Sequence, residues 1–93
     1  MTRAILQEIT DPQRGYVGRF TRRDSYNPFS NKSIFNLEVE DTSTGAREIR
    51  EVGAGYARDV TVHDLQFNRH GNLGAKVVFR PKDYITILSH PTE

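Results

Sequence analysis

The chain has 93 residues, a length that fits one small domain, and we expect residues 1–93 to form a single β domain. Its formal net charge of +1 says little about partners, and its lack of cysteine excludes disulfide bonds, thiolate metal sites and cysteine nucleophiles. No apolar run approaches the roughly 18 residues of a membrane span, and the N-terminal residues lack the apolar segment of a signal peptide, so we expect a soluble cytoplasmic protein.

The N-terminal quarter of the chain predicts two strands joined by a turn. Residues 3–10 alternate weakly between apolar and polar side chains and favour a short strand, although one helical turn fits nearly as well. Residues 11–15 read Asp-Pro-Gln-Arg-Gly, which is typical of a turn because proline fixes φ and glycine tolerates a left-handed exit. Residues 16–22 favour a second strand, in which Gly18 indicates a bulge, a bend or the close approach of another backbone.

Residues 23–32 predict a long basic and aromatic loop, because serine, asparagine and proline dominate them and no apolar period survives. Two aromatic residues of this loop, Tyr26 and Phe29, have no obvious place in a strand pattern. They either anchor the loop against the sheet or stay open for binding, and the sequence leaves both alternatives open.

A β-hairpin follows the loop. Residues 33–40 favour a strand in which we expect Phe35, Leu37 and Val39 to face inward and Asn36, Glu38 and Glu40 to face outward. Residues 41–45 form the hairpin loop, with Gly45 at the position that requires a positive φ. The return strand over residues 46–52 carries charged side chains, which we expect to pair with the acidic ones on a solvated face.

Residues 60–88 predict an antiparallel meander around which the other strands are arranged. Its three strands span residues 60–69, 75–80 and 84–88. The inward period of the first strand slips by one residue after Val62, and a bulge at His63-Asp64 repairs it better than the alternative of one helical turn. Residues 89–93 are expected to form a frayed C-terminal tail.

The segment Gly53-Ala54-Gly55 begins the connection into this meander. A Gly-x-Gly pair can bind phosphate through its backbone N–H groups, but such a site needs a third glycine and a helix that opens directly after it. Here the third glycine is missing and the strand-like Val60-Thr61-Val62 follows. The segment therefore favours a flexible crossover between two sheets over a nucleotide site.

Together these elements predict a mainly β fold, a small antiparallel five- to six-stranded meander or partly open barrel. The order of strand, glycine-bearing strand, two hairpins and terminal strand is similar to that of small barrels of the oligonucleotide-binding (OB-like) and SH3-like types. We expect the core to include Phe35, Leu37, Val39, Val60, Val62, Val77, Phe79, Ile85 and Ile87.

Residues suited to catalysis or metal binding are few. His63, His70 and His90 lie in a strand, a loop and the tail, and no His-x-x-x-His or His-Glu-x-x-His pair is present for zinc. Glu38 and Glu40 share one face of a strand and could form a carboxylate pair, but charged residues that alternate on an outer face are usually just exposed to solvent. No serine has the neighbouring glycines of a nucleophile elbow. We therefore predict no enzymatic activity, no metal site and no cofactor.

In the sequence, a basic and aromatic segment precedes an acidic hairpin. Residues 12–35 contain five cations against one acid, whereas residues 36–52 contain five acids against two cations. Cationic and aromatic side chains interleave in the first segment, and we name them the basic aromatic arm. It consists of Arg14, Tyr16, Arg19, Phe20, Arg22, Arg23, Tyr26, Phe29 and Lys32.

Two functions fit this pattern. Cations hold the backbone of single-stranded nucleic acid while aromatic faces stack its bases, so the arm predicts a small non-enzymatic binding module for single strands. In the alternative, the chain is a protein–protein interaction module with no direct nucleic-acid contact, such as an adaptor, an assembly subunit or a small protein inhibitor of a larger complex, because Arg, Tyr and Phe also enrich protein interfaces. A basic segment and an acidic hairpin would equally suit self-association into a homo-oligomer. The dependence of affinity on salt concentration distinguishes the two functions, because phosphate-driven binding weakens steeply as salt is raised and binding through an apolar protein interface does not.

Overall fold

The computed structural model of the chain describes residues 3–24, 31–80 and 83–89, and within the last range it describes the side chain of Ile87 alone. This part of the chain contains seven strands and one 3₁₀ turn, η1. The strands are β1 (Arg3–Asp11), β2 (Tyr16–Asp24), β3 (Ser33–Asp41), β4 (Arg47–Gly55), β5 (Val60–Phe67), β6 (Leu73–Phe79) and β7 (Asp83–Ser89), and η1 spans Ala57–Asp59.

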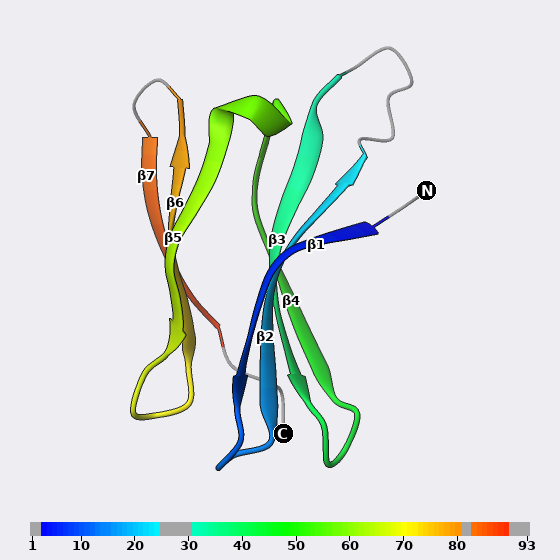
Figure 1. Cartoon of the computed structure of the whole chain (residues 1–93). Coiled ribbons are helices and arrows are strands. Elements are labelled where there is room, and N and C mark those ends of the chain that lie inside the picture. The colour runs from blue at the N-terminus through cyan, green and yellow to red at the C-terminus, as the bar shows by residue number, and fades with distance from the viewer. Residues whose placement is uncertain (1–2, 25–30, 81–82, 90–93) are drawn as a thin grey trace.

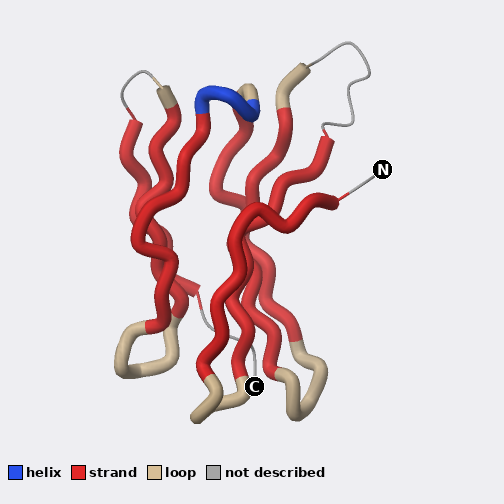
Figure 2. Tube along the Cα trace, viewed as in Figure 1, coloured by secondary structure: helices blue, strands red, loops and turns tan. Residues whose placement is uncertain are grey.

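The strands form two antiparallel meanders, a four-stranded sheet with the order β1-β2-β3-β4 and a three-stranded sheet with the order β5-β6-β7 (Figure 1). The predicted mainly β, antiparallel meander is therefore confirmed, with seven strands in the described residues in place of five or six. The two sheets face each other, since β5 lies against β1 and β2 while β7 lies against β3 and β4. The turn η1 links the sheets at the upper end of the molecule in Figure 2.

The hydrophobic core lies between the two sheets. Its buried members are Phe20, Phe35, Leu37, Val39, Leu65, Leu73, Ala75 and Val77. Aromatic contacts run through it: the rings of Phe20 and Phe35 stack at a centroid distance of 5.7 Å, and Phe35 meets Phe79 edge-to-face at 6.2 Å. Because Phe79 belongs to β6, these contacts join the four-stranded sheet to the three-stranded one.

Most of the predicted core is confirmed. Phe35, Leu37, Val39 and Val77 are buried, and Val60, Val62, Phe79 and Ile87 pack against them. The side chain of Ile85 lies outside the described residues. Phe20 is a correction, because we assigned it to binding and it is instead only 1% exposed inside the core.

Gly18 marks the close approach of the second sheet, one of the three explanations that its position in a strand allowed. A Cβ atom at Gly18 would lie 2.6 Å from Cδ1 of Leu73 and 3.1 Å from Cζ of Phe67. Leu73 is itself fully buried and has little room to move. The glycine therefore sets how closely β2 packs on the facing sheet.

The structure confirms the turn glycines and the bulge. Gly15 and Gly45 have φ values of +73° and +77°, which glycine adopts at little cost. The register of β5 against β6 shifts between His63 and Gln66, and Asp64 in this bulge has a φ of +57°.

Residues 23 and 24, which we expected in the loop over residues 23–32, belong instead to β2, and residues 25–30 lie outside the described residues. Tyr26 and Phe29, the aromatic residues of that loop, lie outside the described residues. Ser89, the first residue of the expected C-terminal tail, belongs instead to β7, and residues 90–93 lie outside the described residues. In the described part of the chain, no helix has the length and apolar character needed to cross a membrane.

Candidate functional site

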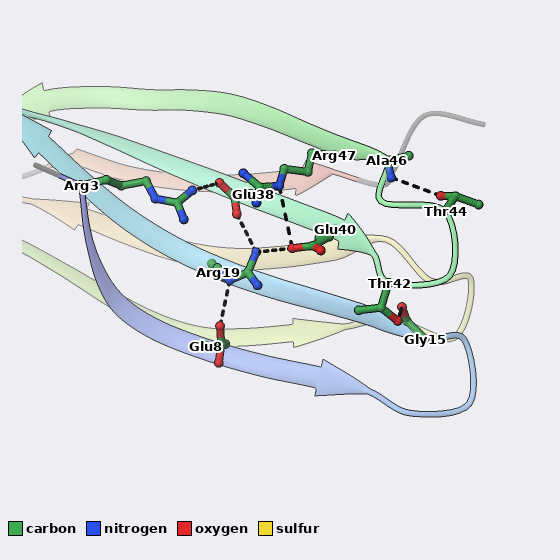
Figure 3. A network of polar contacts seen from close by, with 10 residues as sticks. All are labelled: Arg3, Glu8, Gly15, Arg19, Glu38, Glu40, Thr42, Thr44, Ala46 and Arg47. Atoms are coloured by element: carbon green, nitrogen blue, oxygen red, sulfur yellow. Dashed lines mark hydrogen bonds and ion pairs between the residues drawn. The ribbon is translucent and has the colours of Figure 1, made fainter.

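The outer face of the four-stranded sheet carries an ion-pair network around Arg19 of β2 (Figure 3). The Arg19 guanidinium donates hydrogen bonds to Glu8 of β1 at 2.8 Å and to Glu38 and Glu40 of β3 at 2.6 and 3.0 Å. Arg3 of β1 donates to the other carboxylate oxygen of Glu38. The network therefore ties β1, β2 and β3 together across their outer face.

Burial makes this network different from the solvated face that the sequence predicted. The side chains of Arg19 and Glu38 are only 15% and 1% exposed. Burial lowers the pKa of Arg19, but the hydrogen bonds to Glu8, Glu38 and Glu40 outweigh that effect and hold this pKa above its ordinary value. Arg19 is thus committed to carboxylates, and the prediction that Glu38 is solvated is wrong.

The structure divides the basic aromatic arm among several places. Phe20 lies in the core and Arg19 lies in the ion-pair network. Neither side chain can contact a ligand while these arrangements persist, so we remove both from the candidate site. Tyr26 and Phe29 are outside the described residues, and the structure places neither.

Arg14 and Tyr16 flank the end of the β1–β2 turn, at the lower end of the molecule in Figure 1. Arg14 donates hydrogen bonds to the carboxylate of Asp11 at 2.8 Å and to the backbone carbonyl of Arg69. The Arg14 side chain also holds the pKa of Asp11 below its ordinary value. The centroids of the Tyr16 and Phe67 rings lie 6.1 Å apart. Through these contacts with Arg69 and Phe67, both arm residues hold the turn against the second sheet.

The remaining arm residues lie at the opposite, upper end of the molecule, the end at which β2, β4 and β6 finish and η1 lies (Figure 1). Two cations from outside the arm join them there. We name this set the basic end, and it consists of Arg22, Arg23, Lys32, Arg58 and Arg80. The acidic side chains that the structure describes there are those of Asp24 and Asp59. Positive charge therefore predominates at this end.

Three guanidinium groups of the basic end have no carboxylate partner within the described part of the chain. They are those of Arg22, Arg58 and Arg80. Arg58 instead lies over the ring of Tyr56, at 5.3 Å from its centroid. The ion-paired arginines elsewhere include Arg3, Arg14, Arg19 and Arg47. Guanidinium groups without carboxylates attract anions more strongly than neutralised ones.

A pocket of about 410 Å³ opens at the basic end. It is lined by Lys32, Gly53, Ala54, Gly55, Tyr56, Asp59, Val60, Phe79 and Arg80. The segment Gly53–Gly55, which we expected to be a flexible crossover, is instead the last part of β4 and forms a wall of this pocket. A Cβ atom at Gly53 would lie 3.0 Å from Cζ of Phe79, so the absent side chain lets that ring pack against β4.

The strand register aligns Arg22 with this pocket. Arg22 of β2 pairs with Phe35 of β3, and Phe35 pairs with Gly53 of β4. Two strand spacings, about 10 Å, therefore separate the backbone of Arg22 from the pocket wall. An extended ligand that crosses the end of the four-stranded sheet would meet Arg22 and then the pocket.

Neither a metal site nor a relative adds to this picture. Among the residues that the structure describes, no three His, Cys, Asp or Glu side chains are grouped to hold a metal ion. Comparison of the chain with protein-family models, curated proteins and solved structures gives no match. The chemistry of the basic end is therefore what supports a function.

Proposed function

We propose that this chain is a small non-enzymatic binding module that holds single-stranded nucleic acid at its basic end. The observation that carries the proposal is the gathering of three guanidinium groups without a carboxylate partner in the described residues, at the end where a pocket exposes Tyr56. Guanidinium groups contact phosphates in bidentate geometry, and an aromatic face stacks a base. This pairing of contacts is the usual means of holding single strands.

The exposed ring favours a single strand over a duplex. Tyr56 is 39% exposed and lines the pocket. It can stack only on a base whose face is free, and the bases of a duplex already stack on each other. Of the predicted arm, the proposal keeps Arg22, Arg23 and Lys32, and it adds Tyr56, Arg58 and Arg80.

A titration with two matched double variants tests this proposal. Arg58→Glu with Arg80→Glu reverses two exposed cations of the basic end, and Arg47→Glu with Arg69→Glu reverses two exposed cations at the opposite end. Because both change the net charge equally, a difference between them isolates the position of the charge. The readout is fluorescence anisotropy of a labelled oligo-dT of about 12 nucleotides, within the site sizes of small single-strand-binding domains.

At about 50 mM salt, the double variant of the basic end should bind more weakly than the wild type, because it loses two phosphate contacts and adds two repelling carboxylates. The double variant of the opposite end should bind like the wild type. Equal binding by the two double variants would refute the proposal, as would a wild type that does not bind.

A protein partner is the second candidate, and the edge strand β1 favours it. Ile5 and Leu6 are 48% and 47% exposed and adjacent on a strand that pairs, in the described residues, with β2 alone. An apolar pair on a sheet edge suits an added strand from another chain. The bulge between Ile5 and Gln7 opposes such pairing, which places this candidate second. Its simplest form is a homodimer through β1, whose mass by light scattering would fall on dilution and with Leu6→Lys.

A further inference from the structure

The pocket at the basic end brings together three kinds of chemical group. Its lining residues include the aromatic Tyr56, the cationic Lys32 and Arg80, and the acidic Asp59. A phosphate ligand alone would use the cations and gain nothing from the carboxylate. A nucleotide offers a partner for each group, namely a ring to stack, a phosphate, and hydrogen-bond donors on the base.

The carboxylate of Asp59 makes no hydrogen bond or ion pair within the described part of the chain, although the residue is half-buried. The backbone N–H and C=O groups of Asp59 are both hydrogen-bonded. The Asp59 N–H donates to the carbonyl of Tyr56 at 2.8 Å, and the Asp59 carbonyl accepts from the N–H of Arg80 at 2.8 Å. The backbone of Asp59 is therefore fixed, and its half-buried carboxylate is left to accept hydrogen bonds from a ligand.

We propose that this pocket takes one unstacked guanine base of a bound single strand and recognises it through Asp59. The inference rests on the proposed function and names the base that the same site prefers. In the complex, the two oxygens of the carboxylate accept hydrogen bonds from N1–H and from the N2 amino group of guanine.

The donor pattern of the bases explains the preference. Guanine is the standard base whose Watson–Crick edge carries two adjacent donor groups. In adenine and cytosine the amino group lies beside a ring nitrogen that accepts, and in thymine and uracil the N–H lies between two carbonyls. A carboxylate placed against those edges would face at least one acceptor, and that repulsion supplies the discrimination.

The other pocket residues hold the rest of the nucleotide. The base stacks on Tyr56, whose ring already carries the guanidinium of Arg58 at 5.3 Å. Lys32 and Arg80 face the phosphate that follows. A volume of about 410 Å³ lies within the range of pockets that hold small ligands, roughly 300–1,000 Å³.

The first experiment compares four strands on two proteins. The strands are an oligo-dT of about 12 nucleotides and its versions with one central dG, dA or dC, and the proteins are the wild type and Asp59→Asn. The wild type should bind the dG strand more tightly than the other three, by about 5- to 150-fold, the range for one bidentate base contact. Asp59→Asn should lose this preference, because it removes the carboxylate that accepts from guanine and repels the other bases, and it should bind plain oligo-dT at least as tightly as the wild type does.

The outcomes separate this inference from the proposed function. Binding of all four strands by the wild type with equal affinity would overturn the inference and leave the function standing. A dG preference that persists in Asp59→Asn would overturn the role of Asp59. If no strand binds, the function fails, and a titration with guanosine 5′-monophosphate decides on the pocket.

That titration is followed by the amide NMR resonances of Gly55, Tyr56 and Asp59. Shifts with guanosine 5′-monophosphate that exceed those with adenosine 5′-monophosphate support the guanine pocket without any strand. Equal shifts with both nucleotides, or none, overturn it.

Discussion

The carboxylate of Glu38 accepts a 2.6 Å hydrogen bond from Arg19, its direct cross-strand partner, at a site where Glu38 is only 1% exposed. This pair lies on the face of the sheet turned away from the core. It fixes the register of β2 against β3, because a slip of one residue would place Arg19 opposite Leu37 or Val39. On the outer face, a buried ion network thus fixes the strand register, as apolar packing does on the inner face.

Arg19→Gln should destabilise the fold by about 3–5 kcal/mol, because Glu38 would keep Arg3 as its one cation in the described network. Adding Glu38→Gln should recover part of that loss, since the buried side chain that lost one of its two cations would then carry no charge. Urea unfolding measures both. Arg47→Gln is the control, because Arg47 is half exposed and 3.8 Å from Glu40, and it should cost a few tenths of a kcal/mol. Similar small costs at Arg19 and Arg47 would contradict the account.

Gly18→Ala should cost about 1–3 kcal/mol through overpacking, because the new Cβ would lie 2.6 Å from Cδ1 of the buried Leu73. The added methyl and the leucine compete for one space. In the double variant Gly18→Ala with Leu73→Ala, the loss in unfolding free energy should therefore be smaller than the sum of the two single losses. Strict additivity in that cycle would show that the two residues do not meet.

The sequence predicted the strands well and the roles of their side chains less well. Strict alternation identified Phe35, Leu37 and Val39 as core, because β3 has one apolar and one polar face. In β2 both faces carry an arginine, so alternation did not decide which face is inner, and Phe20 was assigned to binding. The partner of Arg19 depends on strand register, which a local pattern does not contain.

Gly45→Val should cost about 1–2 kcal/mol, the usual penalty of a left-handed backbone for a residue with a Cβ. Gly45 has a φ of +77°, and no atom lies within 4 Å of a Cβ built there, so the cost is one of backbone conformation and not of a clash. Gly45→Asn should cost less, because asparagine tolerates this region. Thermal unfolding of the two variants checks the order, and equal melting temperatures would contradict it.

The lowered pKa of Asp41 predicts that the stability of the fold depends on pH in the acid range. The Ser43 hydroxyl, and after it the Ser43 backbone N–H, donate to Asp41 and lower its pKa from 3.8. A lowered pKa in the folded state means that the contribution is present above pH 3.8 and is lost as the pH falls through the folded-state value. The difference in melting temperature between the wild type and Asp41→Asn should therefore shrink below that pH.

Glu51→Gln is the control for this experiment, because Glu51 is an exposed carboxylate on β4. Its effect on the melting temperature should be small at neutral pH. A gap between the wild type and Asp41→Asn that stays constant into strong acid would show that ionisation of Asp41 plays no part.

The basic end was harder to foresee than the fold, because its cations come from separate segments. A continuous arm in the sequence drew attention to Arg14, Arg19 and Phe20, which the fold distributes over the lower end, the outer face of the four-stranded sheet and the core. A usable signal did exist. In an up-and-down meander every second connection lies at the same end, so Arg58 and Arg80, which follow β4 and β6, had to join the residues that follow β2.

The salt dependence of single-strand binding tests the central claim most directly. The slope of log K against log salt concentration changes by about 0.7 for each phosphate contact with a single strand. The neutral double variant Arg58→Gln with Arg80→Gln should flatten the wild-type slope by roughly 1.4, and Arg47→Gln with Arg69→Gln should leave it unchanged. A wild-type affinity that does not respond to salt, or the same slope in both double variants, would contradict the claim that the basic end holds the phosphate backbone.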